Sequence, residues 1–242
     1  MAIREEEVSY AAGGTTCRGF LAIPEGDAPR PAVIVVHEWW GLNDYIRDRA
    51  RQMAELGYVG LAVDMYGDGQ IGADPAAATE LMGSVLGDIR LGEQRFQAAM
   101  DLLAARPDVD ADKIAAMGYC FGGAIVLHEA RIGMPLRAVV SFHGSLGSFH
   151  KPEKGGVRAR VLVCHGAADA LVPEEDVANL ATEMQEAGAD YRFEAYPDAL
   201  HGFSNPEADA NAAAFGMPIG YDASADQKSF ASMQALFAEV FA

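Results

Sequence analysis

The stretch KIAAMGYCFGGAIVLHEA, Lys113–Ala130, joins a short apolar run to a segment with helical spacing through a turn that carries a cysteine. The run Lys113–Gly118 is typical of a buried strand, and Phe121–Ile132 follows as a helix. The turn itself reads G-x-C-x-G, with Cys120 at its centre. This pattern is typical of a strand–turn–helix unit that lifts a nucleophile above the carboxyl edge of a sheet, with sulfur in place of the usual serine oxygen. The alternative is a buried cysteine in a glycine-rich turn.

Short β-branched runs alternate with helical patterns along the rest of the chain. The other expected strands are Glu6–Tyr10, Thr15–Ile23, Ala32–Val36, Tyr58–Asp64, Leu136–Phe142, Arg160–His165 and Tyr191–Tyr196. The other expected helices are Asp44–Leu56, Ala76–Ala105 with breaks near Gly87 and Gly92, Glu174–Ala187 and Ala225–Phe241. The alternation predicts an α/β fold, with a mostly parallel sheet that carries helices on both faces. The first two strands flank two glycines and predict an antiparallel hairpin. We expect one domain over residues 1–242.

Composition excludes several classes of partner. The chain has 242 residues, half of them apolar, and a net charge of −17. Such an acidic chain repels phosphate backbones and anionic lipid, so we expect neither nucleic acid nor a membrane as partner. The first residues show no apolar secretory segment, and no apolar run approaches the ~18 residues of a membrane span. Three cysteines without framework spacing favour free thiols in the cytoplasm. The expected assembly is a monomer or a small homo-oligomer.

Two further residues follow strand ends. Together with Cys120 they occur in the order nucleophile, acid, histidine, which is the chain order of catalytic residues in folds with this strand–turn–helix unit. Asp169 lies on the loop after the strand in VLVCHGAADALVP, and His201 lies on the loop in YPDALHGF. Together with Cys120 they predict a nucleophile–histidine–acid triad at the edge where open α/β sheets bind ligands. Asp198 and Asp176 compete for the role of the acid, but Asp198 lies close to the histidine in sequence and Asp176 falls in a helical pattern.

A fourth segment, VIVVHEWWGLND, ends a buried strand in Glu38, Trp39 and Trp40. In this fold the corresponding loop supplies one amide to the oxyanion hole, so Trp39 is the expected donor beside the amide of Phe121. Glu38 is expected near the thiol, where its carboxylate accepts the S–H proton or holds the thiol until substrate arrives. The alternative is that Glu38 binds backbone amides or forms an ion pair. The tryptophans are expected as pocket walls.

These residues resemble the dienelactone hydrolases, which are cysteine-dependent α/β-hydrolases. The resemblance covers nearly the whole chain, from VIVVHEWWGLNDYIRDRARQMAELGYVGLAVDMYG through GYCFGG and GAADALVP to HGF. It implies an α/β-hydrolase fold and a carboxymethylenebutenolidase-like activity. It also implies Cys120 as the nucleophile, His201 as the general base, Asp169 as the acid that orients it and Glu38 as the carboxylate that controls the thiol.

The chain departs from the family at the arginines that recognise a substrate carboxylate. One such position, four residues after the catalytic histidine, is Asn205 here, and no Arg or Lys occurs from Asp68 to Ile89. Arg90 and Arg95 lie further along the chain. A neutral lactone or ester is therefore the expected substrate. Its pocket is expected to include Trp40, His143, Phe203 and Asn205, although packing is an alternative role for His143.

The leading hypothesis is hydrolysis of a lactone or small carboxylic ester through an acyl-enzyme on Cys120, with Glu38 or His201 taking the thiol proton. The second is thioester hydrolysis or acyl transfer on the same fold, and the third is a ligand-binding protein without turnover. The six histidines and three cysteines show no HxxxH or CxxC spacing, so neither a metal nor a cofactor is expected.

Overall fold

The computed structural model describes residues 2–26 and 28–242. The chain divides into two compact units, Met1–Met117 and Gly118–Ala242. The expectation of a single domain stays a prediction.

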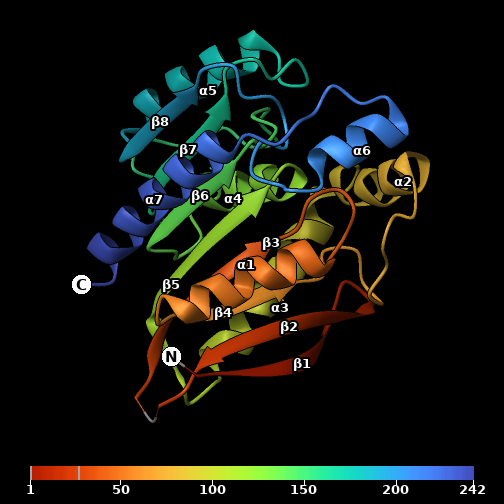
Figure 1. Ribbon diagram of the computed structural model, residues 1–242. Coiled ribbons are helices and arrows are strands. Elements are labelled where there is room, and N and C mark those ends of the chain that lie inside the picture. The colour runs from red at the N-terminus through yellow and green to blue at the C-terminus, as the bar shows by residue number, and fades with distance from the viewer. Residues whose placement is uncertain (1, 27) are drawn as a thin grey trace. The chain divides into compact units, whose positions relative to one another are not determined.

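The first unit consists of strands and helices in the expected alternation (Figure 1). Its elements are β1 (Ile3–Ala12), β2 (Thr15–Pro24), β3 (Arg30–Val36), α1 (Asp44–Glu55), β4 (Val59–Val63), α2 (Pro75–Leu86), α3 (Ile89–Ala104) and β5 (Val109–Tyr119), whose last two residues belong to the second unit. The strand order is β1-β2-β4-β3-β5. β3 and β4 run parallel, whereas β1 and β2 form the expected antiparallel hairpin and β2 runs antiparallel to β4.

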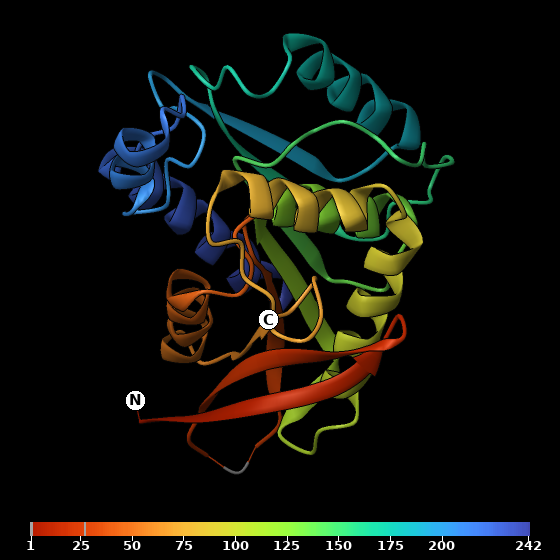
Figure 2. The ribbon, with the colours of Figure 1, turned by 90° about the vertical axis from the view of Figure 1, so that its right-hand side faces the viewer.

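The sequence explains where helix α1 begins and why it packs closely against the strands of this unit. Asn43 caps the helix, because its side-chain oxygen accepts the backbone N–H of Ile46 at 3.3 Å. The apolar face packs against β4 and β2. A Cβ at position 60 would lie 2.3 Å from the carbonyl oxygen of Ala50, so Gly60 is what allows the helix to approach β4 this closely. Helices α1 and α3 cover opposite faces of these strands (Figures 1 and 2).

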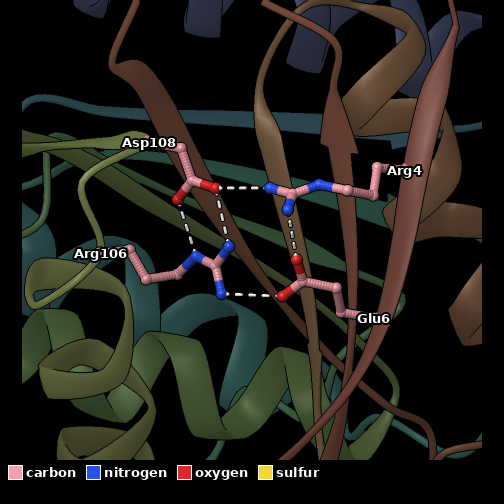
Figure 3. A network of polar contacts seen from close by, with 4 residues as sticks. All are labelled: Arg4, Glu6, Arg106 and Asp108. Carbon is pink, nitrogen blue, oxygen red and sulfur yellow. Dashed lines mark hydrogen bonds and ion pairs between the residues drawn. The ribbon is translucent and has the colours of Figure 1, made fainter. Parts of the chain in front are cut away.

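A ring of four charged side chains ties the N-terminal hairpin to the segment between α3 and β5 (Figure 3). Arg106 holds Asp108 through two hydrogen bonds of 2.7 Å, and it also contacts Glu6 at 3.0 Å. Arg4 closes the ring, because it lies 2.9 Å from Glu6 and 3.0 Å from Asp108. The two-point contact of a guanidinium with a carboxylate fixes both distance and orientation.

The second unit continues the alternation with α4 (Phe121–Arg131), β6 (Ala138–Phe142), β7 (Arg160–Gly166), α5 (Glu174–Ala187), β8 (Tyr191–Tyr196), α6 (Ala208–Phe215) and α7 (Ala223–Val240). β6, β7 and β8 are neighbours in that order and run parallel. Helices α4 and α7 both contact β6, from opposite sides (Figures 1 and 2). Parallel strands bring their carboxyl ends to one edge, where the loops that carry the predicted site residues begin.

The structure corrects the sequence expectations at several points. The break near Gly87 is confirmed, but the expected break near Gly92 is wrong, because Gly92 is buried inside α3. Helix α6 was not expected. The spacing of Asp44–Leu56 predicts one apolar face of Tyr45, Ala50, Met53 and Leu56, but Leu56 follows the end of α1 and is exposed, and Ile46 is buried on that helix instead.

Candidate active site

Cys120 occupies a strained bend between β5 and α4. Its φ of 54° and ψ of −115° are unusual for a residue with a side chain. Two backbone hydrogen bonds hold it there: its N–H donates to the carbonyl of Phe142 at 3.0 Å, and its carbonyl accepts the N–H of Ala124 at 3.3 Å. The thiol is half-buried. The turn therefore presents one reactive side chain where the strand ends and the helix begins.

The glycines around Cys120 are required by close backbone contacts. A Cβ on Gly118 would lie 2.0 Å from the carbonyl oxygen of Gly122. A Cβ on Gly123 would lie 2.6 Å from the Oγ of Ser141. Real Cβ atoms do not approach other heavy atoms so closely, so both positions need glycine for the strand and the helix to meet.

His201 and Asp169 form the second part of the site. The Nδ1 of His201 lies 2.8 Å from the Oδ2 of Asp169, whose side chain is 0% exposed. The other carboxylate oxygen accepts the N–H of Leu171 at 2.9 Å. Of the two competing acids, Asp198 is exposed on a turn and Asp176 lies in the first turn of α5. The structure thus pairs His201 with the acid that the sequence favoured.

His201 also forms a side-chain hydrogen bond with Cys120, which completes a chain of three groups. Burial by itself lowers the pKa of His201, but the negative charge of a Cys120 thiolate and the hydrogen bonds that the imidazole donates to Asp169 and Cys120 raise this pKa well above its ordinary value. An imidazole in this position is able to take the thiol proton and keep it near the sulfur. The structure brings Cys120, His201 and Asp169 together; their catalytic roles stay a prediction.

Three of the predicted pocket residues are buried in the second unit. The rings of His143 and His201 are 5.2 Å apart between centroids, and those of His143 and Phe203 are 5.1 Å apart. Asn205 is buried, and its side-chain oxygen accepts the N–H of Glu207 at 2.9 Å. Asn205 therefore orders the chain just before α6. That these residues touch substrate stays a prediction.

In the first unit, the loop after β3 is fixed by a histidine that the sequence analysis did not single out. The N–H of Met65 donates to the Nε2 of His37 at 3.1 Å, so Nδ1 must carry the ring proton, and it donates to the carbonyl of Glu38 at 2.5 Å. Burial lowers the pKa of His37 to about 4, which keeps the ring neutral in this role. The only sequence signal was its place at the strand end, beside Glu38.

Two other predicted residues of this loop accept hydrogen bonds through their backbone carbonyls. The hydroxyl of Tyr66 donates to the carbonyl of Trp39 at 2.8 Å, and the carbonyl of Trp40 accepts the N–H of Gly72 at 2.9 Å. Glu38 is buried. The expectations that Glu38 controls the thiol and that Trp39 supplies an oxyanion amide stay predictions.

Arg95, one of the two arginines that follow the segment without basic residues, has a role within the first unit. Its side chain is buried, and its Nη1 donates to the carbonyl of Met65 at 2.5 Å. It therefore supports the loop after β4. Arg90 is exposed on α3.

Over residues 2–26 and 28–242, no group of three or more His, Cys, Asp or Glu side chains is arranged to hold a metal ion. Within the same described residues, every helix is too short or too polar to cross a lipid bilayer.

Comparisons with known proteins place these features in a wider context. The model of the Dienelactone hydrolase family matches residues 17–241. A protein of Escherichia coli O157:H7 named "Putative carboxymethylenebutenolidase" is 31% identical over 192 residues, which are 74% of this chain and 70% of that protein. A crystal structure of a dienelactone hydrolase-like promiscuous phosphotriesterase from metagenomic libraries is 39% identical, with a TM-score of 0.92 over 100% of both chains.

A more distant structure, an alpha/beta hydrolase from a deep-sea metagenome, is 17% identical with a TM-score of 0.68 over 98% of both chains, and this likeness concerns the fold alone. The expected α/β-hydrolase fold, mostly parallel with an antiparallel N-terminal hairpin, is confirmed by these matches.

Proposed function

This chain belongs to the dienelactone hydrolase family and is a hydrolase acting on ester bonds, and from that premise we propose that it cleaves a lactone or small carboxylic ester through an acyl-enzyme on Cys120. The observation that carries the proposal is the position of His201, which is hydrogen-bonded to Cys120 on one side and to a fully buried Asp169 on the other. A thiol, a base and an acid that orients the base are the parts that nucleophilic acyl transfer requires.

In the first step, His201 takes the thiol proton, the Cys120 sulfur attacks the substrate carbonyl carbon and the carbonyl oxygen becomes negative. The backbone N–H of Phe121, which follows Cys120 and begins α4, is the proposed donor to this oxyanion, because the residue after the nucleophile supplies such an amide in a strand–turn–helix unit of this kind. The bond from carbon to the alcohol oxygen then breaks, and the leaving alkoxide takes a proton from the His201 imidazolium. The additional roles proposed for Trp39 and Glu38 rest on the sequence pattern.

In the second step, His201 takes a proton from water, and the resulting hydroxide attacks the thioester carbon. The carbon–sulfur bond breaks, the acid product leaves and the Cys120 thiolate is restored. Asp169 stabilises the imidazolium in both steps and fixes Nδ1 as the nitrogen that faces it. The proton that leaves the thiol therefore shuttles through one imidazole and no external acid or base is needed.

The proposed substrates are neutral. Asn205 stands where the family has an arginine, and its side-chain oxygen is used to order the backbone before α6. The segment from Phe193 to Gln227, which surrounds His201, contains no Arg or Lys and several acidic residues. A substrate with a free carboxylate would meet unfavourable charge here, whereas a neutral lactone or ester would not.

The test is hydrolysis of p-nitrophenyl acetate and a panel of neutral lactones by the wild type and by Cys120→Ala. We expect turnover by the wild type and a loss of at least about a thousandfold in Cys120→Ala, because the covalent route is removed. Cys164→Ala is the matched control, since Cys164 is a buried thiol outside the site, and it should keep wild-type turnover. Equal rates for wild type and Cys120→Ala would refute the proposal.

A second candidate activity, hydrolysis of neutral phosphotriesters, is favoured by the 39% identity of the whole chain to a structure named as a promiscuous phosphotriesterase. The same thiolate would attack phosphorus and displace an alcohol, and water would then cleave the sulfur–phosphorus bond. Release of p-nitrophenol from a diethyl p-nitrophenyl phosphotriester, dependent on Cys120, would support this activity. Absence of release at high enzyme concentration would exclude it.

A further inference from the structure

His143 adopts an unusual backbone conformation directly after β6. Its φ is 39°, in the left-handed region that side chains rarely occupy. Its N–H donates to the carbonyl of Cys164 at 2.8 Å, and the residue is completely buried. Such a strained conformation persists where the surroundings determine it, most often at functional sites. The strand just before it, through the carbonyl of Phe142, also holds the backbone of Cys120.

The side chain of His143 packs beside His201, the proposed catalytic base. Its Nε2 is 2.8 Å from the Oγ of Ser204, which is also completely buried. Its ring meets the ring of His201 at an interplanar angle of 65°, in an edge-to-face contact. On another side it approaches the ring of Tyr119, the residue that precedes Cys120, at 6.0 Å between centroids. The His143 ring therefore neighbours the loop of the base and the end of the strand that leads to the nucleophile.

We propose that His143 and Ser204 are a positioning pair that sets the orientation of the His201 imidazole toward Cys120. This inference rests on the proposed function of the triad. The hydrogen bond to Asp169 fixes one nitrogen of His201 but leaves the ring able to swing about that bond. The edge of His143 closes off this motion, and the hydrogen bond to Ser204 keeps the His143 ring from rotating. Ser204 follows His201 by three residues on the same loop, so the pair also holds that loop in place.

A purely packing role predicts a different behaviour. If only volume mattered, a phenyl ring at position 143 would serve as well as the imidazole, and Ser204→Ala would affect stability alone. If orientation matters, loss of the hydrogen bond between His143 and Ser204 lets the His201 imidazole move away from the Cys120 thiol. A displacement of about 1 Å can lower turnover on the order of a hundredfold. The two roles are therefore separable by the chemistry of Cys120.

The experiment compares Ser204→Ala and His143→Phe with the wild type. The first readout is turnover of p-nitrophenyl acetate. The second is the rate of Cys120 alkylation by iodoacetamide as a function of pH, which requires no substrate. We expect kcat to fall by about ten- to a hundredfold with KM changed by less than about threefold. We also expect alkylation of Cys120 at neutral pH to slow, because the His201 imidazole is no longer held where it takes the thiol proton.

Matched controls are Ser229→Ala and His128→Phe. Ser229 is a buried serine on α7 whose hydroxyl donates to the carbonyl of Asp226, and His128 is a buried histidine on α4 that packs against Phe149. Both should keep the wild-type kcat and alkylation profile. Melting temperature and circular dichroism establish that each variant folds. If His143→Phe does not fold, Ser204→Ala decides the outcome, because it removes only one oxygen atom.

Folded variants at positions 143 and 204 with wild-type kcat and an unchanged alkylation profile would overturn the inference. Failure of the proposed function gives another result, namely hydrolysis that does not depend on Cys120. The alkylation profile tests the positioning of the imidazole in either case.

Discussion

The Nδ1 of His201 lies 2.8 Å from the Oδ2 of Asp169, and the carboxylate that makes this contact is inaccessible to solvent. An ionised carboxylate only accepts hydrogen bonds, so Nδ1 carries a proton and Nε2 is the nitrogen that remains for Cys120. The acid thus selects the tautomer in which His201 is able to act on the thiol.

The first prediction concerns Asp169→Asn. An asparagine fits the same space but offers an amide that favours the wrong tautomer, so we expect kcat for p-nitrophenyl acetate to fall by about a hundredfold or more. Asp198→Asn, on an exposed turn, is the control and should leave kcat unchanged. Wild-type kcat in a folded Asp169→Asn protein would show that this carboxylate does not orient the base.

The second prediction concerns the pKa of His201. Burial lowers this pKa, and the Cys120 thiolate and Asp169 raise it above its ordinary value. Cys120→Ala removes the thiolate, which leaves burial opposed by Asp169 alone, so the pKa should fall relative to the wild type. Titration of the His201 ring signal by NMR in both proteins measures the shift. An equal or higher pKa in Cys120→Ala would contradict the placement of the imidazole beside the sulfur.

The third prediction concerns thiol reactivity. Burial raises the pKa of Cys17 to about 11 and that of Cys164 to about 12, so both remain protonated and inaccessible at neutral pH. Only half-buried Cys120 should react with Ellman's reagent in the native protein, and Cys120→Ala should show no fast-reacting thiol. In urea all three thiols of the wild type should react. Rapid reaction of more than one native thiol would mean that the buried cysteines are accessible.

The three residues at strand ends were predictable because parallel strands carry their carboxyl ends to one edge of a sheet. Cys120, Asp169 and His201 each follow a strand of the sheet, and local pattern is enough to find such positions. The hydrogen bond between His143 and Ser204 was not predictable. These residues are 61 positions apart, and their contact depends on how the loops after β6 and β8 pack. Neither belongs to a sequence motif that specifies the contact.

Helix α6 was missed for a different reason. The prolines and glycines on either side of it are typical of a loop, and they outweighed the helical propensity of its alanines. The converse error occurred at Gly92, where a glycine predicted a break inside α3. Packing of α3 against β1 and β3 stabilises the helix despite that residue.

The fourth prediction concerns the ring of charges in Figure 3. Arg106→Ala removes the two-point contact with Asp108 and the contact with Glu6, and we expect the free energy of unfolding to fall by about 1 kcal/mol. The hydrogen bond from Arg106 lowers the pKa of Asp108. A lowered carboxyl pKa contributes stability above the unfolded value of about 3.9, and this contribution is lost as pH falls through the folded value.

The difference between wild type and Arg106→Ala in urea unfolding should therefore be present at pH 7 and shrink below about pH 4. Lys151→Ala, which breaks a fully exposed pair with Glu186, is the control and should unfold like the wild type. A difference that is independent of pH would assign the stabilisation to packing of the Arg106 side chain.

The last prediction compares the effect of alanine substitution on stability at two glycines, Gly118 and Gly83. Gly118→Ala would place a methyl group 2.0 Å from the carbonyl oxygen of Gly122, and backbone on both sides of the turn prevents relief. We expect a loss of at least about 3 kcal/mol in the free energy of unfolding, with loss of Cys120 reactivity in whatever folds. Gly83→Ala, on an exposed face of α2 with nothing within 4 Å of the new Cβ, should instead gain about 0.5–1 kcal/mol. Equal effects of the two substitutions would mean that the strand and the helix are not held together by the contact at Gly118.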